Sequence, residues 1–180
     1  MRNVITLGVI LMVICAVAAG ALAATNNVTA PIIQAQEAQK VQESLKEVLP
    51  NADEFEEQKD LQLPEGVQSV YFAKSGGEDV GIIAVVSPSG YGGPISIMVG
   101  IENEGKISAV RILSHSETAG LGAKITEPSF YEQFTGQSVD KELKVSKDGG
   151  EIDAISAATI SSRAVTNGVN RAIEIFNNLK

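Results

Sequence analysis

The sequence of 180 residues is poor in the side chains that build most metal and disulfide sites. It contains one cysteine, Cys15, one histidine, His115, and no tryptophan. A lone cysteine cannot form a disulfide within the chain, and Cys15 lies in an apolar run, so the polar remainder has no thiolate ligand. A single imidazole likewise argues against zinc, haem or iron–sulfur centres held by this chain alone.

Basic side chains are also scarce. Arg2 is the only charged residue before Glu37, so the rest of the chain carries 13 of the 14 basic and all 22 acidic residues, a net charge of −9. A domain with this charge repels nucleic acids and anionic membrane surfaces. The composition therefore predicts a soluble domain that does not bind nucleic acid.

Common signatures of nucleotide binding and hydrolysis are missing. The glycine run at 90–93 lacks the G-x-x-x-x-G-K-[ST] pattern of a P-loop, and no G-x-G-x-x-G occurs. His115 has a serine on each side, but adjacent residues at a strand end point in opposite directions, and there is no G-x-S-x-G elbow. The sequence thus argues against a serine hydrolase.

One long hydrophobic run is present. Val4–Ala24 has no charged residue, and about 20 apolar residues are needed for a helix to cross a bilayer. Ala21-Leu22-Ala23 has the small-x-small form of a signal-peptide cleavage site, which leaves that alternative open, but the run is longer than a signal peptide needs, so we favour a retained anchor. With Arg2 before it, the positive-inside rule predicts that everything after Thr25 lies outside the cytoplasm.

The segment after the anchor predicts a connector. Thr25–Ala30 is read as a short polar linker and Pro31 as a helix start. A helix with Val41, Leu45 and Val48 on one stripe follows, and Pro50 ends it. The acidic residues between Asp53 and Glu65 predict a solvated face, with docking to a basic partner as the alternative; they are Asp53, Glu54, Glu56, Glu57, Asp60 and Glu65.

Strand-like runs rich in Val, Ile or aromatic residues come next, separated by short glycine-containing breaks. They are Val67–Ala73, Val80–Ser87, Ile95–Ile101 and Lys106–Leu113. Short breaks favour an antiparallel meander. A short helix is expected around Pro128–Phe134 and a long amphipathic helix at the C-terminus. The fold class is therefore predicted to be α+β, an antiparallel sheet flanked by helices with one N-terminal transmembrane helix.

Small and hydroxylated residues fill the stretch before the last helix, Asp153-Ala154-Ile155-Ser156-Ala157-Ala158-Thr159-Ile160-Ser161-Ser162. Ser161 or Ser162 is a natural N-cap, and a helix start is also a ready site for phosphate because its N–H groups are free. The residues alone leave both roles open, and capping is the more common one.

The same stretch resembles the flavinylation motif D-x-x-[ST]-G-A-T of the membrane-anchored FMN-binding domains. The resemblance implies that Thr159 carries FMN through a phosphoester, with Ser156, Ala157, Ala158, Ser161 and Ser162 beside the cofactor. Ala157 stands where the motif has glycine. Alanine is the smallest replacement there and is unfavourable only if φ is positive.

Two glycine loops extend this resemblance. His115-Ser116-Glu117-Thr118-Ala119-Gly120-Leu121-Gly122 is similar to the H-x-E-T-P-G-L-G loop of the family, with Ala119 at the proline position. Gly90-Tyr91-Gly92-Gly93 is similar to its G-Y-G-G turn. The resemblance places Tyr91, Glu117, Thr118, Leu121 and Gly122 around the flavin ring, and it implies that a larger side chain at Gly122 would crowd the ring.

The resemblance covers the whole chain and is strongest to the G subunits of Rnf-type complexes. It implies residues 1–24 as the transmembrane anchor, 25–66 as the linker and amphipathic helix, and 67–180 as the FMN-binding domain. It further implies electron relay between ferredoxin and NAD coupled to ion movement, other membrane subunits as partners, and a flavin transferase for maturation. The alternatives are a flavin relay of another extracytoplasmic system and a non-redox anchored adaptor.

Overall fold

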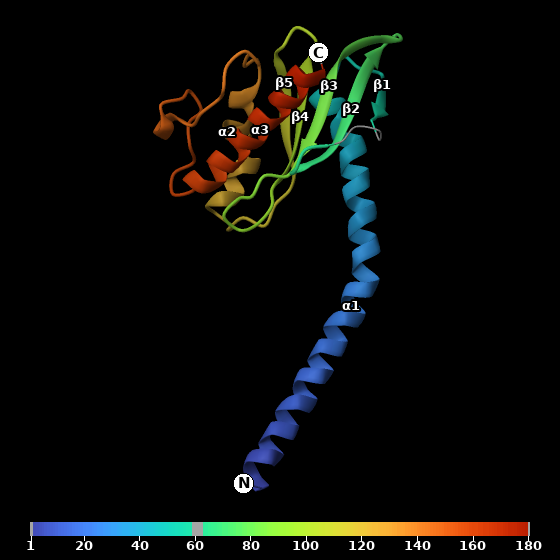
Figure 1. The fold of residues 1–180 in the computed structure, drawn as a ribbon, viewed down its shortest axis with the longest axis vertical. Coiled ribbons are helices and arrows are strands. Elements are labelled where there is room, and N and C mark those ends of the chain that lie inside the picture. The colour runs from blue at the N-terminus through green and yellow to red at the C-terminus, as the bar shows by residue number, and fades with distance from the viewer. Residues whose placement is uncertain (1, 59–62, 180) are drawn as a thin grey trace. The chain divides into compact units, whose positions relative to one another are not determined.

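The computed structural model describes residues 2–58 and 63–179 and divides into two compact units, Met1–Lys40 and Val41–Lys180. Within the described residues the chain forms three α-helices, shown in Figure 1: α1 (Arg2–Val48), α2 (Pro128–Tyr131) and α3 (Thr159–Leu179). The same residues also form five strands: β1 (Glu54–Glu57), β2 (Val67–Ser75), β3 (Glu78–Val86), β4 (Ser96–Glu102) and β5 (Ile107–Ser114). Short 3₁₀ turns lie at Gly122–Thr126 (η1), Glu132–Phe134 (η2) and Ser146–Asp148 (η3).

Helix α1 contains the membrane anchor. Its stretch Ile5–Ile33 is long and apolar enough to cross a bilayer. The predicted linker at Thr25–Ala30 and the helix start at Pro31 are wrong, because α1 continues through both with Pro31 inside it. The hydroxyls of Thr25 and Thr29 donate to the carbonyls four residues before them, at 2.9 and 3.0 Å, so these two polar side chains are satisfied on the helix itself.

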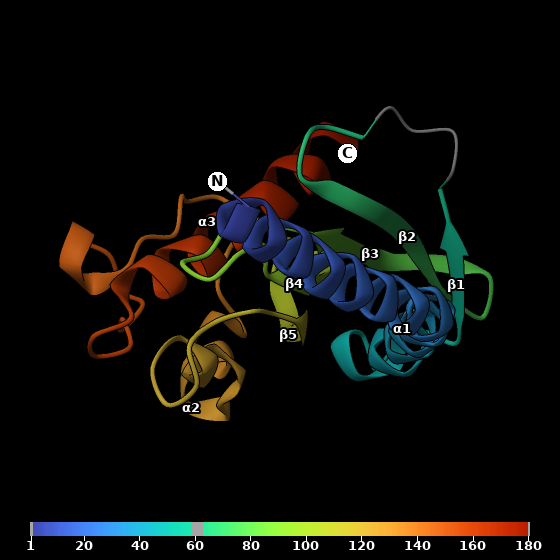
Figure 2. The same ribbon diagram turned by 90° about the horizontal axis from the view of Figure 1, so that it is seen from below.

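The sheet is an antiparallel meander in the order β1-β2-β3-β4-β5, which confirms the predicted connectivity of the four strand-like runs. Strand β1 was not predicted because its sequence, Glu-Phe-Glu-Glu, is short and acidic. It forms one edge of the sheet, opposite β5 and α2 (Figure 2). Charged side chains suit an edge strand since they discourage further pairing. Asp60 of the acidic segment lies outside the described residues.

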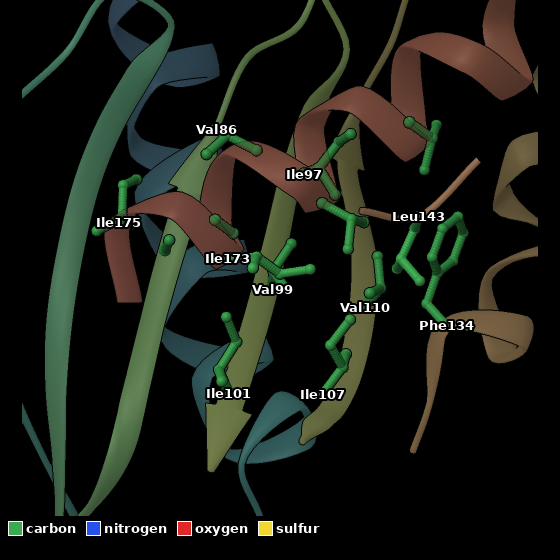
Figure 3. Close-up of a cluster of buried hydrophobic side chains, with 14 of the residues drawn as sticks. Val86, Ile97, Val99, Ile101, Ile107, Val110, Phe134, Leu143, Ile173 and Ile175 are labelled. Atoms are coloured by element: carbon green, nitrogen blue, oxygen red, sulfur yellow. The ribbon is translucent and has the colours of Figure 1, made fainter. Parts of the chain in front are cut away.

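Helix α3 covers one face of the sheet. Val165, Val169, Ala172 and other apolar residues of its inner stripe are buried against β3 and β4. In Figure 3, Val86, Ile97 and Val99 of the strands lie beneath α3, and Phe134 and Leu143 close the core beside β5. The predicted amphipathic C-terminal helix is therefore confirmed, and its burial fixes where its first turn lies.

The opposite face of the sheet is covered by residues 41–52. Leu45 and Val48 are at most 1% exposed there and Val41 is partly buried against the same cluster, which confirms the predicted apolar stripe. The end of α1 approaches the sheet so closely at Gly100 that a Cβ on this residue would lie 2.5 Å from Val48 Cγ1. The sheet thus lies between two helical layers, and the predicted α+β class is confirmed.

Candidate functional site

The first turn of α3 differs from the prediction. Helix α3 begins at Thr159, so Ser161 and Ser162 lie inside it and the expectation that one of them is the N-cap is wrong. Both are buried. The Ser162 hydroxyl donates to the Ala158 carbonyl and accepts the Ile155 N–H, each at 3.0 Å, which secures the preceding loop to the helix. Thr159 is therefore the first residue of the helix, and its hydroxyl accepts a hydrogen bond from Lys147, described below.

Ala157 has the left-handed backbone that the motif's glycine suits. Its φ is 63°, and it is the only non-glycine residue with positive φ among the described residues. Alanine in this region is strained by about 1–2 kcal/mol because its Cβ approaches a carbonyl oxygen. Because alanine stands here in place of the motif's glycine, the backbone is strained at Ala157, two residues before Thr159.

Ala157→Gly should relieve this strain. We expect a net stabilisation of about 0.5–1 kcal/mol, because the greater freedom of glycine in the unfolded chain offsets about 0.4–1 kcal/mol of the gain. The free energy of unfolding in urea measures this stabilisation. Ala154→Gly is the matched control, since Ala154 has no positive φ, and it should be destabilising. Equal effects of the two substitutions would contradict the strain at Ala157.

Glu117 connects three segments of the site. Its side chain is buried, with the residue only 8% exposed. Oε1 accepts the Gly92 N–H at 2.9 Å, and Oε2 accepts the Ser161 hydroxyl at 2.5 Å. Glu117 N–H in turn donates to Nδ1 of His115 at 3.2 Å. The carboxylate thus joins the loop after β3, the loop after β5 and the first turn of α3.

Glycine is required around this carboxylate for close packing. A Cβ on Gly122 would lie 2.4 Å from Glu117 Oε2 and 2.7 Å from Ser161 Oγ, and a Cβ on Gly92 would lie 2.1 Å from the Ser116 carbonyl oxygen. Gly122 is itself buried. A larger residue at Gly122 would therefore act first on the contact between Glu117 and Ser161, and only through it on a bound ring.

A hollow of about 560 Å³ opens beside these segments. It is lined by Tyr91, Glu117, Thr118, Leu121, Gly122, Ala157, Ala158, Thr159, Ile160 and Ser161. The structure thus brings the three resembling segments together. Two predicted site residues do not line the hollow: Ser156 is exposed and Ser162 is buried beneath the helix start.

Apolar side chains stand around this hollow. Tyr91, Leu121 and Ile160 are 71%, 44% and 52% exposed, and they are the only large hydrophobic residues exposed in the described part of Val41–Lys180. Their positions suit a flat apolar ring, and the volume falls within the range of about 300–1,000 Å³ typical of ligand sites. A second hollow, of about 300 Å³ between Glu65 and Arg171, contains no predicted site residue.

Two residues of the site were not predicted. Ile160 follows the motif threonine and looked like an ordinary helix residue. Lys147, in the turn η3, donates from Nζ to the Thr159 hydroxyl at 2.9 Å. Lys147 has no local sequence signal, whereas Ile160 could have been found as an apolar residue off the buried stripe of α3.

The turn that carries Lys147 is joined to α3 by an ion pair. Arg163 donates from Nε and Nη2 to the two Asp148 carboxylate oxygens, both at 2.7 Å. These hydrogen bonds lower the pKa of Asp148 below its ordinary value. Asp148 is therefore charged at neutral pH, and the pair is lost only as the pH falls through that lowered pKa.

Comparison with known proteins gives two family matches. Residues 90–174 match the FMN-binding domain family, and residues 1–48 match the RnfG N-terminal region. The first match includes all three segments around the hollow. The second covers the membrane anchor and the remainder of α1.

Relatives match over nearly the full chain. The G subunit of the Na⁺-translocating ferredoxin:NAD⁺ oxidoreductase complex of Acetobacterium woodii is 43% identical, covering 99% of this chain and 94% of the relative. The G subunit of the ion-translocating oxidoreductase complex of Methanosarcina acetivorans is 37% identical, covering 92% and 90%.

Solved structures share the fold. NqrC of Shewanella oneidensis is similar with a TM-score of 0.52 at 21% identity, covering 73% of each chain. The C subunit of the Na⁺-translocating NADH-quinone reductase of Parabacteroides distasonis has a TM-score of 0.50 at 25% identity, covering 60% of this chain and 62% of that one.

Proposed function

Since the chain belongs to the family of G subunits of ion-translocating oxidoreductase complexes, we propose that it carries FMN covalently, through a phosphoester to Thr159. The family makes it a membrane-anchored flavoprotein subunit that relays electrons within an Rnf-type complex with other subunits. The covalent bond would be formed by a flavin transferase, which uses FAD as the donor and is therefore a proposed partner.

The single observation that carries the proposal is the position of the Thr159 hydroxyl. Thr159 is the first residue of α3 and one of the residues that line the hollow, so a group joined to its hydroxyl would lie near both the N-terminus of the helix and the place for the ring. Helix N-termini favour phosphate because these N–H groups and the helix dipole face it. A phosphate joined to Thr159 would therefore leave the ring within reach of Tyr91, Leu121 and Ile160.

The chain's own residues then position and shield the flavin. FMN supplies reversible electron transfer when bound, and the protein sets its potential through burial and hydrogen bonds. Thr118 lines the hollow, and its side chain can hydrogen-bond to ring or ribityl atoms. Glu117 holds the loops together, because both of its carboxylate oxygens already accept protein donors. Covalent attachment also prevents loss of the flavin by dilution outside the cytoplasm.

The absorbance of denatured protein tests the proposal. Protein made with its flavin transferase should stay yellow after acid precipitation and washing, because a phosphoester keeps the flavin on the chain. Loss of the colour into the supernatant would contradict covalent attachment. Colourless native protein would favour the adaptor alternative, in which the hydroxyl cluster serves the helix start alone.

We further propose that the domain after α1 lies outside the cytoplasm, as the uncharged run behind Arg2 predicts. Protease added to spheroplasts should then digest the domain while a cytoplasmic marker protein survives. Immunoblotting with an antibody against the C-terminal region measures the digestion. Protection of the domain until the membrane is broken would place it in the cytoplasm.

A further inference from the structure

Among the residues that the structure describes, Lys147 is the positively charged group in contact with the proposed attachment oxygen. Its Nζ lies 2.9 Å from the Thr159 hydroxyl oxygen, to which it donates. It takes part in none of the ion pairs found among residues 2–58 and 63–179, whereas the neighbouring Lys144 pairs with Glu142 at 3.0 Å. The ammonium charge of Lys147 is thus directed at an uncharged hydroxyl.

The turn that presents Lys147 is held from both sides. Val145 and Ile152 are each 1% exposed and anchor it in the core. Ser146 N–H donates to the Ile152 carbonyl at 2.7 Å, and Asp148 N–H donates to the Val145 carbonyl at 2.8 Å. The Arg163–Asp148 pair joins the same turn to the second turn of α3. The backbone of Lys147 is therefore held in place, with its side chain beside Thr159.

A hydroxyl alone gives little reason for this arrangement. An exposed lysine that donates to a neutral oxygen gives up side-chain freedom for a weak hydrogen bond, whereas an ammonium beside a phosphate forms a charge-assisted one. The domain also carries a net negative charge, which opposes the addition of a further anion. A nearby cation is what a phosphate at Thr159 requires.

We propose that Lys147 provides the counter-charge for the phosphate attached to Thr159, both during its transfer and in the product. This inference rests on the proposed attachment site. In the transfer, Thr159 Oγ1 forms a bond to the phosphorus of the FMN half of FAD, while the phosphoanhydride P–O bond breaks. AMP leaves with the bridging oxygen and the hydroxyl proton passes to solvent, so nothing is oxidised or reduced. Lys147 stabilises the negative charge on the phosphoryl oxygens throughout.

The rate of flavin attachment tests this role. The full chain in detergent is incubated with a purified flavin transferase and FAD, and the adduct is followed by intact mass. Lys147→Met should lower kcat by about tenfold, less than the loss of a buried oxyanion donor because this site faces solvent. Lys147→Arg should restore the rate, since it keeps the charge. The advantage of the parent over Lys147→Met should shrink as salt is added.

Lys144→Met is the matched control, because it removes a charge from the same loop without touching Thr159. It should react like the parent. Attachment to Lys147→Met at the parental rate, a loss that Lys147→Arg does not restore, or a rise in KM alone would overturn the counter-charge role. The attachment proposal fails separately, if the parent forms no adduct or if Thr159→Ala forms one.

Discussion

Thr159→Ala should abolish the flavin adduct completely. The substitution removes the hydroxyl of the residue that begins α3 and lines the hollow. Alanine keeps the helix, so stability should change by no more than about 0.5 kcal/mol. The measurement is mass spectrometry of the tryptic peptide 148–163, from protein made alongside the flavin transferase. The parent peptide should carry the FMN mass and the variant peptide none.

Ser156→Ala is the matched control for this experiment. Ser156 lies in the same peptide but is exposed and does not line the hollow, so its removal should leave the adduct in place. Thr159→Ser should retain the adduct because it restores the hydroxyl. Fragment ions that locate the flavin on Ser156, Ser161 or Ser162, or an adduct that survives Thr159→Ala, would show that attachment occurs elsewhere.

The largest effect on stability is expected for Glu117→Ala. The substitution leaves the buried Ser161 hydroxyl and the part-buried Gly92 N–H without their acceptor, and it also opens a cavity. An unsatisfied buried polar group costs about 1–3 kcal/mol, so we expect the free energy of unfolding to fall by about 2–4 kcal/mol. Urea unfolding followed by circular dichroism measures this loss.

Glu117→Gln is the control that keeps the size and the hydrogen-bonding atoms of the side chain and removes only its charge. The amide oxygen can accept the Gly92 N–H and the amide nitrogen can donate to the Ser161 oxygen, so the change should be within about 1 kcal/mol. If Glu117→Ala unfolds at the same urea concentration as the parent, the carboxylate does not join the three segments.

Several features of the fold depended on packing rather than on local pattern. Pro31 and the polar residues before it predicted a break, but the threonine hydroxyls hydrogen-bond to carbonyls of the helix itself and α1 continues. Strand β1 has an acidic sequence that exists as a strand only because it pairs with β2. The serines read as N-caps are instead buried, because the apolar stripe of α3 brings its first turn onto the core.

By itself the sequence determined the membrane anchor, the four-strand meander, the amphipathic last helix and the candidate Thr159. These depend on hydrophobic runs, periodicity, turn residues and motif spacing, all of which are local. Only the tertiary structure decided that Glu117 contacts Ser161, 44 residues away, and that Lys147 contacts Thr159, 12 residues away. No local pattern encodes such contacts, since they follow from how the sheet and α3 pack and from where the loops between them are held.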